Sequence, residues 1–322
     1  PDARKLGIGG GFCYLCYPCK RTLQAQGNKQ NLIQMNMRTL LVMLFSVLFS
    51  CKSEPGNKTA IPDPIIYQAR DKEILEQIFE SYSDEKEAAT AELMIKVGSF
   101  FLQTPYVAHT LETEEEQLVI NLREMDCTTF AENCLAISRC IKSGNLSFDP
   151  FCSELQLIRY REGKIDAYPS RLHYFCDWIH NNQQKKLIKD MSEDLAQTPH
   201  NRQINFMSTH PDSYRQLKED TSLVKVIAGQ EKLISAREMF YIPECRIAEV
   251  ESELMDGDIA GITTEIEGIA IQHVVILIRV EGRIHMMHAS SKAGKVMISE
   301  NTLEDYLLNS KSASGIMVAR PL

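Results

Sequence analysis

Apolar residues recur every three or four positions in several segments of the first half of the chain, and this periodicity predicts helices. We expect helices over Glu73–Phe79, Ala88–Phe101, Cys127 to about Lys142, and Tyr168–Gln184. Apolar runs of strand length gather mainly later in the chain, over Leu155–Tyr160, Asp258–Thr263, Ile271–Val280, Ile284–Met287, Val296–Ile298 and Gly315–Val318. Helices followed by strands predict an α+β fold.

The helix expected from Cys127 begins with a cysteine in its first turn. Asp126 is a favourable N-cap residue, Gly144 a favourable stop, and the expected buried stripe consists of Phe130, Cys134, Ile137 and Ile141. A thiolate at a helix N-terminus is stabilised by the helix dipole and by unpaired amides, which can lower a cysteine pKa from about 8.5 to roughly 3.5–7.5. The placement therefore predicts a reactive thiol, and a structural cysteine at a buried helix start is the alternative.

Two apolar runs near the end of the chain carry histidines and predict a β-hairpin. His273 lies in the first run, His285 and His288 lie in the second, and Glu281-Gly282 supplies the turn. Antiparallel pairing about that turn sets residue 273 opposite 290, so His273 and His288 share a sheet face while His285 points to the other face. Nucleophilic Cys127, basic His273 and a third residue that orients the base would form a papain-like hydrolytic site. Half-buried strand histidines without a catalytic role are the alternative.

The order of these segments resembles the NlpC-type cell-wall cysteine amidases. The shared features are a helix start reading Asp-Cys-Thr-Thr-Phe, a strand opening Asp256-Gly257-Asp258-Ile259, then His273 and a partner strand reading His288-Ala289-Ser290. More narrowly, the chain is similar to the N-acetylmuramoyl-L-alanine amidase-like branch of Bacteroides and its relatives. That resemblance covers roughly residues 98–322 and rests on further segments: Thr104–Ala108 with Leu111-Glu112, Arg159–Arg161 with Gly163, Tyr168–Phe175 with Asp177–Ile179, Asn205–Ser208 with His210, and Gly315-Ile316 with Arg320.

The resemblance implies a papain-like core with added helices, in which the helix of the catalytic cysteine packs on an antiparallel sheet. It also implies hydrolysis of the amide between N-acetylmuramic acid, preferably in its terminal 1,6-anhydro form, and L-alanine of the stem peptide. In this family Cys127 corresponds to the nucleophile, His273 to the general base and acid, and His288 to the orienting residue, with His285 as the fallback.

Substrate binding is expected from polar and aromatic residues of the same segments: Tyr106, Asp126, Tyr168, Ser170, Arg171 and Asn205. Arg171 is expected either to pair with a carboxylate of the stem peptide or to hold a loop. We expect no metal and no other cofactor, since the sequence lacks an HExxH run and a histidine cluster with zinc spacing.

A short apolar segment near the start of the chain predicts a lipoprotein signal peptide over residues 37–51. It begins with Met37-Arg38-Thr39, is too short to span a membrane, and ends in Leu48-Phe49-Ser50-Cys51, which resembles a bacterial lipobox. We therefore expect Cys51 to be lipidated, residues 1–36 to lie outside the native protein, residues 52–66 to form a tether, and residues 67–322 to form a single catalytic domain. An ordinary signal peptide or a buried helix is the alternative.

Charge and composition limit the classes of binding partner that we expect for the protein. The chain of 322 residues has a net charge of −8 and no basic block, which argues weakly against nucleic-acid binding. We expect peptidoglycan muropeptides as partners, a membrane reached through the lipid anchor, a periplasmic location and a monomer. Such a location permits disulfides without requiring them among the cysteines beyond Cys51, which are Cys127, Cys134, Cys140, Cys152, Cys176 and Cys245.

Two other functions fit the same sequence. The first keeps the chemistry but hydrolyses the γ-D-glutamyl-diaminopimelate bond, which is the commoner activity of NlpC-type enzymes. The second is a cell-wall-binding lipoprotein that has lost catalysis on the same scaffold. The presence of both Cys127 and His273 argues against this second alternative.

Overall fold

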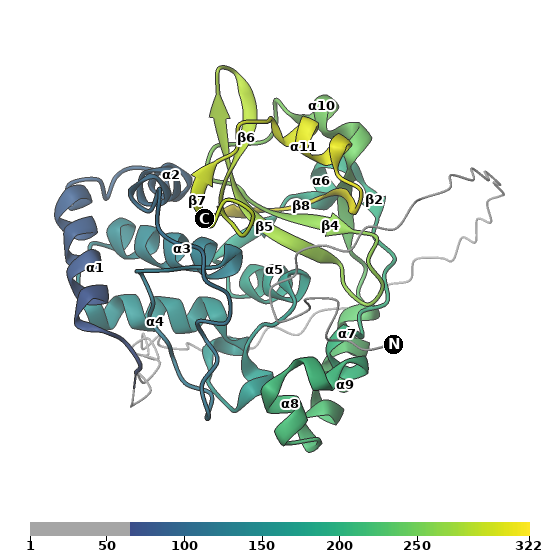
Figure 1. The fold of residues 1–322 in the computed structure, drawn as a ribbon. Helices are drawn as coiled ribbons and strands as arrows, with labels where there is room; N and C mark the ends of the chain where they lie inside the picture. Colours follow the sequence, from purple (N-terminus) through teal and green to yellow (C-terminus); the bar gives the residue numbers. More distant parts are fainter. Residues whose placement is uncertain (1–64) are drawn as a thin grey trace, which may run out of the picture. The chain divides into compact units, whose positions relative to one another are not determined.

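A computed structural model describes residues 65–322, which begin with helices and end with strands (Figure 1). This order is the α+β arrangement expected from the apolar pattern. The expected leader, the lipidation site Cys51 and most of the expected tether lie outside the described residues. Among residues 65–322, no helix has both the length and the apolar character needed to cross a membrane.

The first part of the chain folds into α1 (Ala69–Tyr82), α2 (Thr90–Phe100), α3 (Cys127–Ser143), α4 (Phe148–Arg159) and α5 (Phe175–Gln184). The expected helices around Glu73–Phe79 and Ala88–Phe101 are confirmed as α1 and α2, and α3 begins at Cys127 as expected. Gly144 ends α3 in the left-handed conformation, with φ of 73°, which a residue without a Cβ adopts readily.

The helix expected over Tyr168–Gln184 is only partly present. Residues Tyr168–Ser170 form a short 3-10 turn, and the α-helix begins only at Phe175. Pro169 in this turn has no amide hydrogen, and the amide of Leu172 donates to the carbonyl of Arg159 instead of to a preceding turn. Residues 168–173 are therefore a loop fixed against α4.

The prediction of a strand over Leu155–Tyr160 was wrong, because these residues form the end of α4 and its C-cap. The buried residues of α4 include Phe151, Cys152, Leu155 and Ile158, which recur at helical spacing. A short segment rich in apolar residues fits a buried helix as well as a strand. Here the helical spacing of buried residues begins upstream at Phe151 and indicates a helix.

The remaining chain forms an antiparallel sheet interleaved with short helices. The strands are β1 (Ile188–Asp190), β2 (Thr198–Pro199), β3 (Phe240–Pro243), β4 (Ile259–Thr264), β5 (Ile271–Val280), β6 (Arg283–Ser290), β7 (Lys295–Ile298) and β8 (Ala313–Pro321). Their order is β2-β3-β8-β4-β5-β6-β7, and β1 also pairs with β8. The helices between them are α6 (Ser192–Ala196), α7 (Phe206–Thr209), α8 (Arg215–Glu219), α9 (Ser222–Ser235), α10 (Ile247–Val250) and α11 (Leu303–Asn309).

Both faces of the sheet are buried, each in its own core. In β5, Val274 and Ile276 belong to the core shared with α1 to α5, whereas Val275 and Leu277 belong to the core shared with α10 and α11. Figure 1 shows the two groups of helices on opposite sides of the sheet. Burial on both faces explains why these strands appear in the sequence as continuous apolar runs.

The hairpin that carries the histidines has the expected register. Glu281-Gly282 forms the turn, and the ladder pairs Val280 with Arg283 and Ile276 with Met287. Continued along the strands, this register sets residue 273 opposite 290, as the sequence predicted. Helix α3 packs against both strands of this hairpin, which brings the helix of Cys127 to the strands of the histidines.

Candidate active site

Cys127 occupies the first position of α3, and a capping box fixes the helix start around it. The carboxylate of Asp126 accepts a hydrogen bond from the amide of Thr129 at 2.8 Å, and the Thr129 hydroxyl accepts one from the amide of Asp126 at 2.9 Å. Cys127 itself is half-buried and lines a cavity of about 460 Å³. The thiol therefore stands at the positive end of the helix dipole, on the wall of this cavity.

The other cysteines of the described residues lie in different surroundings. Burial raises the pKa of the thiols of Cys134, Cys140, Cys152 and Cys176, for Cys152 and Cys176 to about 12, which keeps these groups protonated. Cys245 is exposed and does not line the cavity. Cys176 reaches the cavity wall, but with this raised pKa it is a poor nucleophile.

His273 contributes to the same cavity as Cys127 and contacts His288. Nε2 of His273 lies 2.6 Å from Nδ1 of His288, and the two rings meet edge to face. His285 is turned elsewhere, with its Nδ1 2.9 Å from the carbonyl oxygen of Ser299. The structure thus brings His288 to His273 and places the fallback residue His285 away from it.

Both histidines of the pair are held neutral. Burial, followed by the proximity of His288, lowers the pKa of His273 to about 3, and burial lowers the pKa of His288 to about 4. In a pair of neutral imidazoles one ring nitrogen donates and the other accepts, so the short contact fixes one tautomer of each ring.

Four of the residues expected to bind substrate line the cavity, and two do not. Tyr106, Asp126, Tyr168 and Arg171 are on its wall, together with Cys127 and His273. Ser170 instead stabilises its own loop, because its hydroxyl accepts from the amide of Asp166 and donates to the carbonyl of Ala167. Asn205 caps the short helix α7, where its carbonyl accepts from Thr209, and it lies outside the cavity lining.

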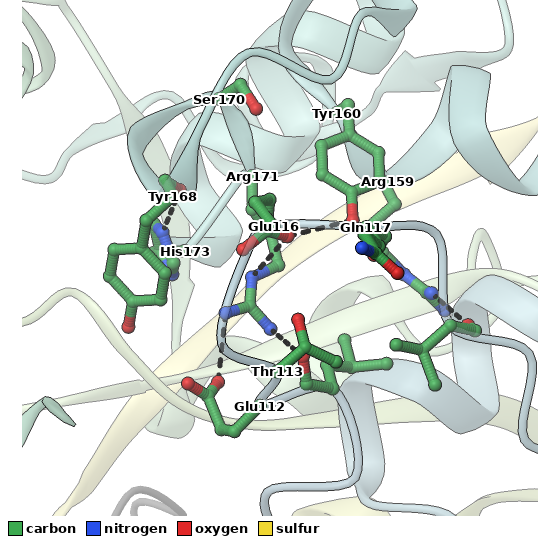
Figure 2. A network of polar contacts seen from close by, with 12 residues as sticks. Glu112, Thr113, Glu116, Gln117, Arg159, Tyr160, Tyr168, Ser170, Arg171 and His173 are labelled. Carbon is green, nitrogen blue, oxygen red and sulfur yellow. Dashed lines mark hydrogen bonds and ion pairs between the residues drawn. The ribbon is translucent and has the colours of Figure 1, made fainter. Parts of the chain in front are cut away.

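Arg171 is nearly enclosed, with 7% of its side chain exposed, and two protein carboxylates hold its guanidinium. Nη2 donates to Glu112 at 2.9 Å, and Nε lies 3.3 Å from Glu116 (Figure 2). The guanidinium also stacks over the ring of Tyr168, 5.0 Å from its centroid. These contacts agree with the loop-holding alternative for Arg171, since its charge is already paired with two carboxylates of the protein.

The acidic partners of this network were not assigned to the site from the sequence. The Tyr160 hydroxyl donates to Glu116 at 2.8 Å, and Arg159 donates to the equally buried Glu132 at 2.7 Å. Burial raises the pKa of both Glu116 and Glu132, and the neighbouring arginines oppose that effect. Nothing in the sequence around Glu112 and Glu116 indicates their partners, and only the fold places Arg171 and Tyr160 against them (Figure 2).

The groups that bring nucleophilic and basic chemistry to the cavity are the thiol of Cys127 and the imidazole of His273, which contacts His288. The carboxylates of the cavity already have partners within the protein, because Asp126 caps α3 and both Glu112 and Glu132 pair with arginines. Within residues 65–322, no group of three or more His, Cys, Asp or Glu side chains is arranged to hold a metal ion.

Comparison with known proteins identifies relatives of this chain. The family model of N-acetylmuramoyl-L-alanine amidase-like proteins, called AmiA-like, matches residues 96–316. A solved N-acetylmuramoyl-L-alanine amidase from Bacteroides uniformis is 37% identical and superposes with a TM-score of 0.70, covering 72% of this chain and 98% of that one. A Bacteroides fragilis protein described as a candidate xylanase is 39% identical, with a TM-score of 0.65 and coverage of 70% and 99%.

A Legionella pneumophila protein of the DUF1460 family shares the fold at 21% identity, with a TM-score of 0.60 and coverage of 83% of this chain and 97% of that one. At this identity the similarity concerns the fold alone. A search of curated protein sequences gave no match.

Proposed function

This chain belongs to the N-acetylmuramoyl-L-alanine amidase-like family, and we propose that it is a cysteine amidase of peptidoglycan fragments. The bond hydrolysed is the amide between N-acetylmuramic acid and the L-alanine of its stem peptide. The observation that carries the proposal is that Cys127 and His273 line the same cavity, while His273 also contacts His288. Helix α3 packed against the hairpin of β5 and β6 supports a papain-like core for this chemistry.

The roles of the three residues follow from their atoms. His288 engages Nε2 of His273, which leaves Nδ1 as the nitrogen to exchange a proton with the thiol of Cys127. Because His273 is neutral, its Nδ1 can be the unprotonated nitrogen that accepts this proton. The thiolate then attacks the lactyl carbonyl carbon, and the C–S bond forms as the carbonyl π electrons move to oxygen.

The second half of the reaction uses the same groups. The amide of Cys127, at the positive end of α3, is placed to stabilise the oxyanion. As the C–N bond breaks, His273 gives its proton to the departing L-alanine amine. Water then hydrolyses the muramoyl thioester with His273 again acting as base, which regenerates the thiol.

Product analysis on a defined muropeptide tests the bond assignment. We propose the disaccharide ending in 1,6-anhydro-N-acetylmuramic acid, with a stem of L-Ala, D-Glu and diaminopimelate, as the preferred substrate. The amidase releases the free disaccharide and a peptide that begins with L-alanine, both resolved by mass spectrometry. Release of the sugar still carrying L-Ala-D-Glu would assign the γ-D-glutamyl-diaminopimelate endopeptidase activity instead, and no hydrolysis would favour the non-catalytic alternative.

The description of the B. fragilis relative raises glycoside hydrolysis as another candidate. That chemistry generally needs two carboxyl groups that face each other across the scissile bond. In this cavity, Glu112 and Glu132 are tied to Arg171 and Arg159, and Asp126 caps α3. The committed carboxylates favour the thiol reaction over glycoside hydrolysis.

We also propose a periplasmic, lipid-anchored location. The lipobox-like segment ending at Cys51 supports it, and so does the chemical nature of the proposed substrate, since peptidoglycan fragments arise outside the cytoplasmic membrane.

A further inference from the structure

A second cavity adjoins the first on the other side of the histidine pair. It has a volume of about 620 Å³, and Gln272, His273 and Ser291 line both cavities. Alternate residues of β6, namely Met286, His288 and Ser290, form part of its wall, as the period of a strand requires. The two spaces therefore adjoin at His273, with Cys127 lining only the first.

The two cavities differ in the charges they offer to a substrate. In the first, Arg159 pairs with the buried Glu132, and Arg171 pairs with the buried side chain of Glu116 and with the partly exposed Glu112. The third arginine of that lining, Arg215, donates to the carbonyl of Thr113. In the second, Lys292 and Lys311 stand on the rim, both exposed, and neither makes an ion pair within the described residues. Glu300 is the acidic residue among the lining residues of this second cavity, so its rim offers two ammonium groups against one carboxylate.

The direction of the reaction assigns a substrate part to each cavity. His273 must protonate the nitrogen that leaves, so the group attached to this nitrogen lies on the histidine side of the scissile bond. The acyl part remains with Cys127, in the first cavity. In a muropeptide the leaving group is the stem peptide, in which the γ-linked D-glutamate keeps a free α-carboxylate.

We propose, resting on the amidase function above, that the second cavity binds the departing stem peptide, with Lys292 and Lys311 attracting the α-carboxylate of its D-glutamyl residue. The muramoyl sugar then occupies the first cavity. In this proposal the stem-peptide carboxylate is bound by lysines that lack a protein partner among the described residues. Arg171 does not bind it, because its guanidinium pairs with Glu112 and Glu116.

Two substrates that differ in one charge test the assignment. 1,6-Anhydro-N-acetylmuramoyl-L-Ala-D-Glu carries the α-carboxylate, and 1,6-anhydro-N-acetylmuramoyl-L-Ala-D-isoglutamine carries a neutral amide in its place. Lys292→Gln and Lys311→Gln should each lower kcat/KM for the charged substrate by about threefold, and the double variant by about tenfold, since exposed ion pairs are individually weak. The loss should appear in KM, should shrink at high salt, and should be absent for the isoglutamine substrate.

Lys225→Gln is the matched control, because Lys225 is exposed on α9 and lines neither cavity. An equal loss for both substrates, or no loss in the double variant, would overturn the assignment of the second cavity while the amidase function stands. If the wild-type protein cleaves the muramoyl-L-alanine bond of neither substrate, the proposed function itself fails, and the assignment of the second cavity fails with it.

Discussion

At the scale of single residues, the contact between one ring nitrogen of His273 and one of His288 fixes how the two rings are oriented. The contact of His273 Nε2 with His288 Nδ1 restricts the His273 ring to one orientation, whereas His285 contacts the backbone of Ser299. The pair also lies on a cavity wall and is held neutral by burial. His273 also lines the cavity that Cys127 lines, which a purely structural pair of strand histidines would not require.

Replacing the two candidate orienting residues separates their roles. His288→Ala should lower kcat by about a hundredfold or more, because His273 then loses the partner that fixes its tautomer and orientation. His285→Ala should leave turnover close to that of the wild type. Steady-state kinetics on one muropeptide measures both variants, and the opposite ranking would transfer the orienting role to His285.

Another histidine, His173, links the cavity wall to the pH dependence of stability. Burial, followed by Arg171, lowers its pKa to about 3, and its Nε2 contacts the carbonyl of Tyr168 at 2.8 Å. Since the unfolded chain binds this proton near pH 6.5 and the folded protein does not, the free energy of unfolding decreases as the pH falls from about 6.5 towards 3.

His173→Gln should remove this histidine's share of the decrease. That share is about 2 kcal/mol at pH 5, as an order of magnitude. Urea unfolding at pH 7.5 and pH 5 measures it, and the variant should lose less stability between the two values than the wild type does. An equal loss in both proteins would show that His173 does not titrate in this way.

At the scale of elements, the start of α3 connects sequence most directly to function. The capping box of Asp126 and Thr129 fixes the first turn of the helix, and Cys127 lies inside that turn. Asp126→Ala should cost about 1 kcal/mol of stability and lower activity in addition, because the fraying of this turn displaces the thiol.

Ser147 supplies the control for this helix cap. It stands at the N-cap of α4 but makes no capping hydrogen bond with its side chain. Ser147→Ala should therefore change both stability and activity little, as measured by thermal unfolding and initial rates. If Asp126→Ala matched Ser147→Ala in activity, the helix start would not position the nucleophile.

The helices and strands also show which structural features the sequence patterns could predict. The start of α3 at Cys127 and the register of the histidine hairpin were predictable, because an N-cap and a two-residue turn are local signals. The strand expected over Leu155–Tyr160 failed because a short apolar run is ambiguous between a strand and a buried helix. Partners such as Glu116 for Arg171 lie 55 positions away in the chain and follow only from the fold.

At the scale of the whole molecule, the net charge of −8 would repel an anionic muropeptide. At physiological ionic strength the Debye length is about 8 Å, so distant charges are largely screened and nearby ones dominate. Recognition of a stem-peptide carboxylate therefore depends on cations at the cavity itself. Lys292 and Lys311 are the cations proposed for this role.

The membrane anchor proposed for the whole molecule is Cys51, which lies outside the described residues. Expressed from Met37 in a Gram-negative host, the protein should enter the detergent phase and carry acyl chains on Cys51, since each buried methylene contributes roughly 0.8 kcal/mol. Cys51→Ser should stay unprocessed or appear as soluble periplasmic protein. A fully soluble wild-type protein whose N-terminus is not residue 51 would contradict the anchor.

The central claim is that the thiol of Cys127 performs the hydrolysis, and turnover of an anhydro-muropeptide by Cys127→Ala tests it most directly. The variant should release no disaccharide while its circular dichroism and its affinity for the muropeptide stay near those of the wild type. Cys134→Ala, which alters a buried thiol of the same helix, should keep its activity at some cost in stability. Continued hydrolysis by a folded Cys127→Ala protein would contradict the account.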